Sequence, residues 1–142
     1  RTAGRGIRVC VHIIVGLPGE SHADILETAR VLASLPVQGI KIHALLALKG
    51  TVLGDRYARG EIQTVSREHY VGTVCDVLEC LPPDLVVQRL TADGYKDIFL
   101  GPPWAVNKMA VLNAIDRELE RRDAWQGCRS APRPRRNPED MG

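Results

Sequence analysis

Lys41 and His43 are the residues of the sequence with the clearest potential for chemistry. They lie two positions apart in a β-rich, mostly apolar run over 40–46, and side chains alternate between the faces of a strand, so both share one face. A buried charge is costly without a partner, so this face should meet either a carboxylate from another segment or a polar substrate. A cation and an imidazole can hold an anionic or hydroxyl-bearing molecule or move a proton. Hydrogen-bonded interior groups with a purely structural role are the alternative.

Two other β-rich runs add polar side chains. His12 lies in the run over 7–15, on the same face as Ile14, and Gln88 or Arg89 supplies a polar group in a third run. If the three runs are neighbouring strands, these groups gather around Lys41 and His43. We therefore expect His12 and Arg89 to contact a substrate.

A glycine-containing turn follows the first run. Residues 16–20 read Gly-Leu-Pro-Gly-Glu, and Ser21 with Asp24 forms a weak capping box for a helix predicted over 22–35. Ligands of α/β proteins bind at this carboxyl edge of the strands. The turn matches neither a phosphate-binding P-loop nor a dinucleotide fingerprint. A ligand site and an ordinary strand-to-helix turn both remain open from these residues alone.

The predicted elements alternate between strand and helix. A helix over 22–35 joins the first two runs, and an amphipathic helix between Ser66 and Pro82 precedes the third run at 84–90. Strands that alternate with helices at this length are typical of an α/β fold with a parallel sheet and right-handed crossovers.

The remaining segments are predicted to be loops, one more helix and a tail. A loop passes through Gly54, and residues 91–103 are irregular. A helix over 104–123 has its apolar positions at Met109, Leu112, Ile115 and Leu119. Residues 124–142 carry Pro and Arg without periodicity, so we expect them to form a disordered tail after a folded part over 1–123.

The near-continuous apolarity of residues 7–15 is typical of a parallel strand covered on both faces. Three parallel strands cannot close a barrel, and an edge strand this apolar would be left uncovered. The chain also begins with Arg rather than Met. Together these features lead us to expect further strand–helix units upstream.

Composition narrows the class of protein without naming a partner. The 142 residues are 44% hydrophobic and 25% charged, as in soluble globular domains. The net charge of +2 belongs to residues 124–142, since positive and negative residues balance over 1–123. The folded part therefore offers no global charge argument for nucleic acid.

The sequence lacks the marks of a membrane or a metal-binding protein. No apolar run is long enough to span a bilayer and no signal peptide pattern is present, so we expect a cytoplasmic protein. The four cysteines form no Cys-x-x-Cys pair, so we expect reduced structural thiols and no metal site.

An ordered set of short motifs extends from about Arg8 to Gly127. These are Gly16-Leu17-Pro18-Gly19-Glu20, Lys41-Ile42-His43, Leu45, Leu48-Lys49-Gly50-Thr51, Gln88-Arg89-Leu90-Thr91, Pro102-Pro103-Trp104, Lys108, Arg121-Arg122-Asp123 and Gln126-Gly127. In this order they closely resemble the C-terminal half of the YhcC-type radical S-adenosylmethionine (SAM) proteins. That family is related to the radical domain in the catalytic subunit of Elongator.

The resemblance implies the C-terminal part of a partial (β/α)6 barrel. In such families a 4Fe-4S cluster cleaves SAM to a 5′-deoxyadenosyl radical, and the Gly-Leu-Pro-Gly turn follows the fifth strand. The run over 40–46 would then be the sixth strand, and Ile14 would pack on the adenine of SAM. The cofactor-binding residues implied in this way are Ile14, Gly16, Leu17, Pro18, Gly19 and Glu20.

One motif of the family is absent from this sequence. The Cys-x-x-x-Cys-x-x-Cys motif that binds the cluster does not occur, so the cluster ligands are expected upstream of this chain. The chain alone should therefore perform no radical chemistry. Lys41 and His43 are then expected as catalytic residues on the substrate side, since cluster irons bind thiolates.

Two functions from different classes follow. The first is a fragment of a radical SAM enzyme that contacts SAM and substrate and requires the missing N-terminal half of the barrel. A tRNA substrate is implied only by the kinship with Elongator. The second is a non-catalytic binding or assembly module, or a decayed remnant, without the cluster. An in-frame cluster motif in the DNA upstream of Arg1 would favour the enzyme, and a start codon close to Arg1 would favour the module.

Overall fold

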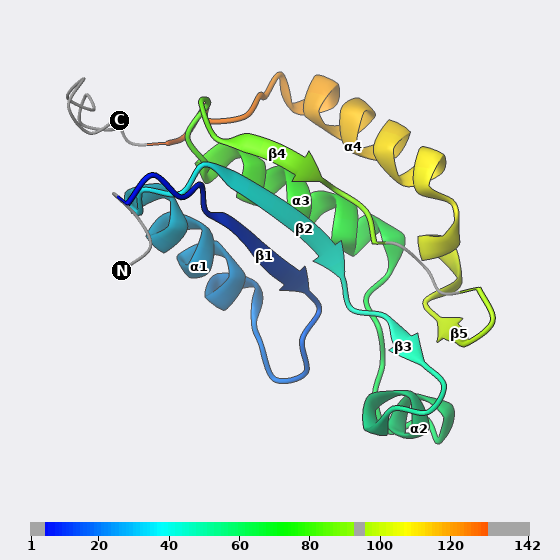
Figure 1. Ribbon diagram of the computed structural model, residues 1–142. Helices are drawn as coiled ribbons and strands as arrows, with labels where there is room; N and C mark the ends of the chain where they lie inside the picture. The colour runs from blue at the N-terminus through cyan, green and yellow to red at the C-terminus, as the bar shows by residue number, and fades with distance from the viewer. Residues whose placement is uncertain (1–4, 93–95, 131–142) are drawn as a thin grey trace.

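The computed structural model describes residues 5–92 and 96–130. Within these ranges, three parallel strands form the main sheet in the order β1 (Cys10–Val15), β2 (Gly39–Ala44) and β4 (Val86–Arg89). Helix α1 (His22–Ser34) makes the crossover from β1 to β2 (Figure 1). The predicted α/β class with parallel strands and intervening helices is confirmed.

The first strand is shorter than the run over 7–15 that predicts it. The backbone N–H of Val9 donates to the side-chain oxygen of Gln38 at 2.6 Å, and the Val9 carbonyl accepts from the N–H groups of Gln38 and Gly39. A side chain therefore takes the place of a strand partner at Val9. Ladder pairing begins one residue later, at Cys10.

The helices cover one face of the sheet. Figure 1 shows α1 and α3 (Arg67–Cys80) behind β1, β2 and β4, with α4 (Lys108–Arg122) beside α3. The core between sheet and helices is aliphatic, with Tyr70 as its one fully buried aromatic side chain in the described ranges. Its members include Ile13, Val15, Ile40, Ile42, Ile25, Ala29, Val74, Val77, Leu78, Val111 and Ile115. The opposite face of the sheet has no helix over it among the described residues.

Helix α1 begins as the sequence predicts. The Ser21 hydroxyl accepts from the N–H of Asp24, and the Asp24 carboxylate accepts from the N–H of Ser21 at 2.8 Å. The helix ends at Ser34, shortly before Pro36, which lacks the N–H that a helix interior requires. This capping box holds the start of α1 directly behind the glycine turn.

Two segments predicted as loops contain regular structure. Residues 52–58 form α2 (Val52–Ala58), capped by Thr51, whose hydroxyl accepts from the N–H of Gly54. The short strands β3 (Ala47–Leu48) and β5 (Phe99–Gly101) pair antiparallel in a second sheet beyond the end of β2 (Figure 1). No side chain can be added at Gly54, because its Cβ would overlap the carbonyl oxygen of Leu48.

The last helix starts later than predicted. Residues 103–106 form a short 3₁₀ turn, and Asn107 then caps α4, accepting from the N–H of Ala110 at 3.1 Å. Met109, expected in the core, is 64% exposed, because the buried stripe of α4 follows Val111 and Ile115. Met109 lies two residues from Val111, about 200° around the helix axis, and so faces away from α3.

The C-terminal boundary also differs from the sequence prediction. Residues 124–130 form a turn against the end of α3, where the Gln126 amide donates to the carbonyls of Pro82 at 2.8 Å and Leu85 at 2.7 Å. The N–H of Gly127 donates to the carbonyl of Leu78. A helix end leaves carbonyls without intrahelical partners, and this turn supplies their donors. The expected tail from residue 131 onward lies outside the described residues.

None of the helices described has both the length and the apolarity needed to cross a membrane.

Candidate functional site

The two histidines and the lysine singled out from the first two strands lie on the face of the sheet opposite the helices. Burial alternates along β1, where Ile13 and Val15 are buried while His12 and Ile14 are exposed. The same alternation in β2 leaves Lys41 and His43 only half-buried, between fully buried neighbours. We call this surface, carrying His12, Ile14, Lys41 and His43, the open face.

His12 and His43 contact each other across the two strands. His43 Nε2 lies 3.3 Å from His12 Nδ1, with the ring centroids 5.3 Å apart. A hydrogen bond at this distance requires one ring nitrogen to donate and the other to accept. The structure thus joins a residue expected to bind substrate with one expected to be catalytic.

The third strand adds side chains beside Lys41. The parallel register pairs Lys41 with Arg89, after an irregularity next to Ile40. The side chain of Gln88 lies over Gly39, since a Cβ at Gly39 would be 2.9 Å from the Gln88 Nε2 atom. β4 therefore contributes an amide, and Arg89 lies next to Lys41 in the register.

The glycine turn leaves the carboxyl end of β1, directly after Ile14 and Val15. Gly16 and Gly19 have φ angles of +98° and +80°, which residues with a side chain rarely adopt. A Cβ at Gly16 would also lie 3.3 Å from a methyl group of Val65. The turn can therefore approach a ligand through its backbone, and Ile14 beside it is 38% exposed on the open face.

A cavity of about 250 Å³ lies between this turn and the N-terminal ends of α1 and α3. The turn lines one side of the cavity, and His22, His69 and Thr73 from the two helices line the other. The rings of His22 and His69 are 6.3 Å apart, edge to face. None of the four residues that define the open face lines this cavity. The cavity and the open face are therefore two separate surfaces.

A comparison with family models matches residues 37–121 to the radical SAM C-terminal domain. The chain belongs to this family. The radical SAM C-terminal domain accounts for β2, α3, β4 and nearly all of α4, so it includes Lys41, His43 and Arg89. The resemblance to YhcC-type radical SAM proteins is thereby confirmed.

Two relatives of this radical SAM domain are similar over most of the chain. The chain is 51% identical to YtqA of Bacillus subtilis over 122 residues, and the match covers 86% of this chain and 38% of YtqA. It is 33% identical to YhcC of Escherichia coli K12, covering 81% of this chain and 37% of YhcC. The chain thus spans less than two fifths of the length of either relative.

A solved structure has a similar fold. The archaeal Elp3 of Methanocaldococcus infernus, with its N-terminus deleted, matches with a TM-score of 0.72 at 18% identity. The match covers 89% of this chain and 29% of Elp3. At this identity the likeness shows a shared fold.

The described part of the chain, including the turn upstream of the matched domain, has groups that suit SAM but none that suit an iron–sulfur cluster. An exposed isoleucine followed by a backbone turn of two left-handed glycines offers an apolar contact and free backbone groups to an adenosyl group. In residues 5–92 and 96–130, by contrast, no group of three His, Cys, Asp or Glu side chains is placed to hold a metal. Burial raises the pKa of the Cys75 thiol to about 11, which disfavours the thiolate that a cluster requires.

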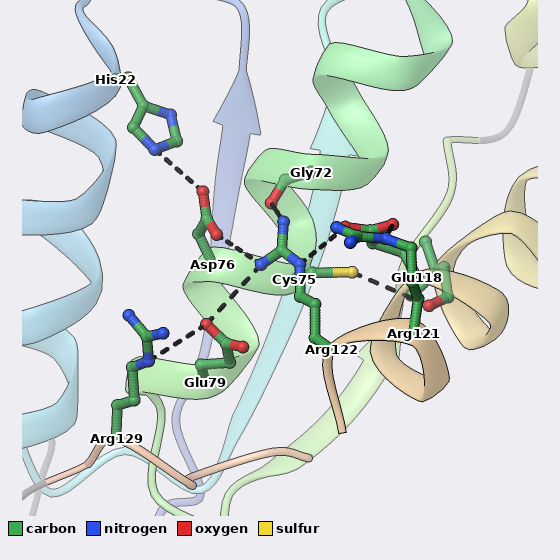
Figure 2. A network of polar contacts seen from close by, with 10 residues as sticks. His22, Gly72, Cys75, Asp76, Glu79, Glu118, Arg121, Arg122 and Arg129 are labelled. Carbon is green, nitrogen blue, oxygen red and sulfur yellow. Dashed lines mark hydrogen bonds and ion pairs between the residues drawn. The ribbon is translucent and has the colours of Figure 1, made fainter. Parts of the chain in front are cut away.

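A polar network that no single sequence motif indicates lies behind the cavity. His22 contacts Asp76 at 3.0 Å, Arg122 pairs with both Asp76 and Glu118, and the buried Glu79 lies 3.7 Å from Arg122 (Figure 2). The pairing of Glu118 with Arg122 is predictable from its four-residue spacing. Their meeting with Asp76 depends on how α4 packs on α3, which no local pattern reveals.

Proposed function

We propose that this chain is the part of a radical SAM enzyme that contacts the adenosyl group of SAM and the substrate. The observation that carries the proposal is the position of Ile14. It is exposed on the same face as His12, Lys41 and His43 and lies two residues before the first glycine of the turn. A cofactor over Ile14 would therefore lie beside the polar groups that could receive a substrate.

In this proposal SAM binds to Ile14 and to the turn formed by Gly16, Leu17, Pro18, Gly19 and Glu20. Ile14 would supply an apolar surface for the adenine ring, and the turn would approach the cofactor closely because Gly16 and Gly19 carry no side chains. A 4Fe-4S cluster held upstream would, together with SAM, supply a carbon-centred radical.

The substrate part of the proposal assigns Lys41 and His43 to catalysis and His12 and Arg89 to substrate binding. The hydrogen bond between His12 and His43 fixes the ring of His43 relative to β1. His43 is thereby oriented to hold or move a proton at the substrate. The support for a tRNA substrate is the kinship with the catalytic subunit of Elongator.

Because the chain spans only 38% of YtqA, the experiment uses a chimera in which it replaces the matching segment of that relative. We call this protein the YtqA chimera. Ile14→Asp in the chimera should weaken SAM binding by about 1–3 kcal/mol from lost apolar contact alone, with the cost of desolvating a carboxylate added. Calorimetry measures the SAM affinity, and unfolding monitored by circular dichroism verifies that the variant is folded.

Val86→Asp is the matched control, because Val86 is also exposed, at 58%, on a strand of the same sheet. Its SAM affinity should equal that of the parent chimera. Unchanged SAM affinity in a folded Ile14→Asp variant would remove the proposed role of Ile14.

A non-catalytic assembly module is the second candidate. It is favoured by the lack, in the described part of the chain, of side chains placed to hold a metal. Sequencing the DNA upstream of Arg1 separates the two functions. An in-frame Cys-x-x-x-Cys-x-x-Cys supports the enzyme, and a start codon close to Arg1 supports the module.

A further inference from the structure

The strands of the main sheet carry basic groups and no acidic ones. The sequences of β1, β2 and β4 read CVHIIV, GIKIHA and VVQR, so they hold two histidines, a lysine and an arginine without any Asp or Glu. The carboxylates of the polar network in Figure 2 come from α3 and α4, behind the sheet. Any carboxylate that pairs with these groups must therefore come from outside the three strands.

Lys41 lies at the centre of this arrangement. It is half-buried, and it makes no ion pair or side-chain hydrogen bond with any residue in 5–92 and 96–130. The register places His12 directly beside it on β1, and neighbouring strands lie about 4.8 Å apart. A half-buried ammonium group without a counter-ion favours the approach of a negative charge.

The histidine pair strengthens the same preference. His12 contacts His43 through Nδ1 at 3.3 Å, so the Nε2 atom of His12 faces away from this contact. A proton on this nitrogen makes a charge-assisted donor, and an anion beside it stabilises the protonated ring. Lys41 and His12 can therefore converge on one anionic group.

We propose that His12 and Lys41 bind an anionic group of the substrate, a phosphate or a carboxylate. This inference rests on the proposed function, because it takes the open face as the substrate side of a SAM-binding site. SAM carries a carboxylate of its own, which is a second source of the same chemistry. The experiment must distinguish the two sources.

The test titrates inorganic phosphate, and separately acetate, into the YtqA chimera. The ring NMR signals of His12 and His43 are followed, first without SAM and then at saturating SAM. Phosphate, acetate or both should shift these signals in a saturable way, and the affinity should be the same with SAM present. Lys41→Gln should weaken that affinity by about tenfold or more, and Lys41→Arg should restore most of it.

Lys49→Gln is the matched control, since Lys49 is an exposed lysine outside the main sheet, and it should leave the affinity unchanged. Failure of both anions to shift the ring signals would overturn the proposal, as would equal affinity in a folded Lys41→Gln variant. Loss of anion binding at saturating SAM would assign the site to the carboxylate of SAM and overturn it for the substrate. Anion binding without any SAM affinity would instead refute the proposed function and leave the anion site standing.

Discussion

His22 Nε2 lies 3.0 Å from a carboxylate oxygen of Asp76, which ties the first turn of α1 to the C-terminal half of α3. The other oxygen of Asp76 accepts from Arg122 of α4 at 2.6 Å. One carboxylate thus joins three helices directly behind the glycine turn. The position of the start of α1, and with it the end of the turn, depends on this contact.

Asp76→Asn should lower the free energy of unfolding by about 1–3 kcal/mol, because Arg122 would lose the charge of a carboxylate that it contacts at 2.6 Å. Urea unfolding of the YtqA chimera measures the change. Asp116→Asn, at an exposed position of α4, should alter the stability by no more than about 0.5 kcal/mol. Equal effects of the two substitutions would show that the network does not contribute to stability.

Glu118 should contribute to the acid sensitivity of the fold. Hydrogen bonds from Arg121 and Arg122 lower the pKa of its carboxyl from an ordinary 4.5 to about 2. A folded-state pKa below the unfolded value adds stability above pH 4.5, and this stability is lost as the pH falls from 4.5 toward 2.

The measurement for Glu118 is urea unfolding of the YtqA chimera at a series of pH values. Glu118→Gln should be less stable than the parent near neutral pH, and the difference should shrink as the pH falls through this window. Stability curves that stay parallel from pH 7 to pH 2 would exclude the contribution.

Lys41 and His43 should separate substrate chemistry from cofactor binding. Replacing either with Gln or Ala in the YtqA chimera should abolish product formation while the cluster absorbance and the SAM affinity stay at parent values. Absorption spectroscopy, calorimetry and product analysis by mass spectrometry provide the three readouts. Loss of the cluster from a folded variant would show that these residues support the cluster and would overturn their assignment to the substrate.

β1 should make the isolated chain prone to association. It is an edge strand of the main sheet in the described residues, and edge strands present unpaired backbone groups to other chains. Light scattering should therefore detect oligomers or aggregates of the 142-residue chain and a defined species for the YtqA chimera. A stable monomer of the isolated chain would contradict this expectation.

Local patterns predicted the sheet and its polar face, and tertiary contacts account for what they missed. The alternation of His12 with Ile13 and of Lys41 with Ile42 follows from strand geometry alone, so the open face could be predicted. The pairing of Leu48 with Phe99 joins segments about fifty residues apart, and two short strands leave no periodicity to detect.

Contacts between side chains and segments distant in the sequence were equally impossible to predict from local patterns. Gln126 lies in a segment without periodicity, and only its hydrogen bonds to carbonyls beyond α3 fix its place. Asp76 and His22 are ordinary polar residues on two helices, and their contact depends on how those helices pack. The residues of the open face thus follow from local sequence patterns, and the polar groups that join the helices behind the sheet do not.

Gly54 limits how this protein can change during evolution. The Leu48 carbonyl oxygen occupies the place where a Cβ at position 54 would lie, so no other amino acid fits while β3 and α2 keep their present junction. A descendant with any side chain at this position must first have moved the strand or the helix. A side chain at this position in a related sequence therefore marks a corner between β3 and α2 that follows a different path.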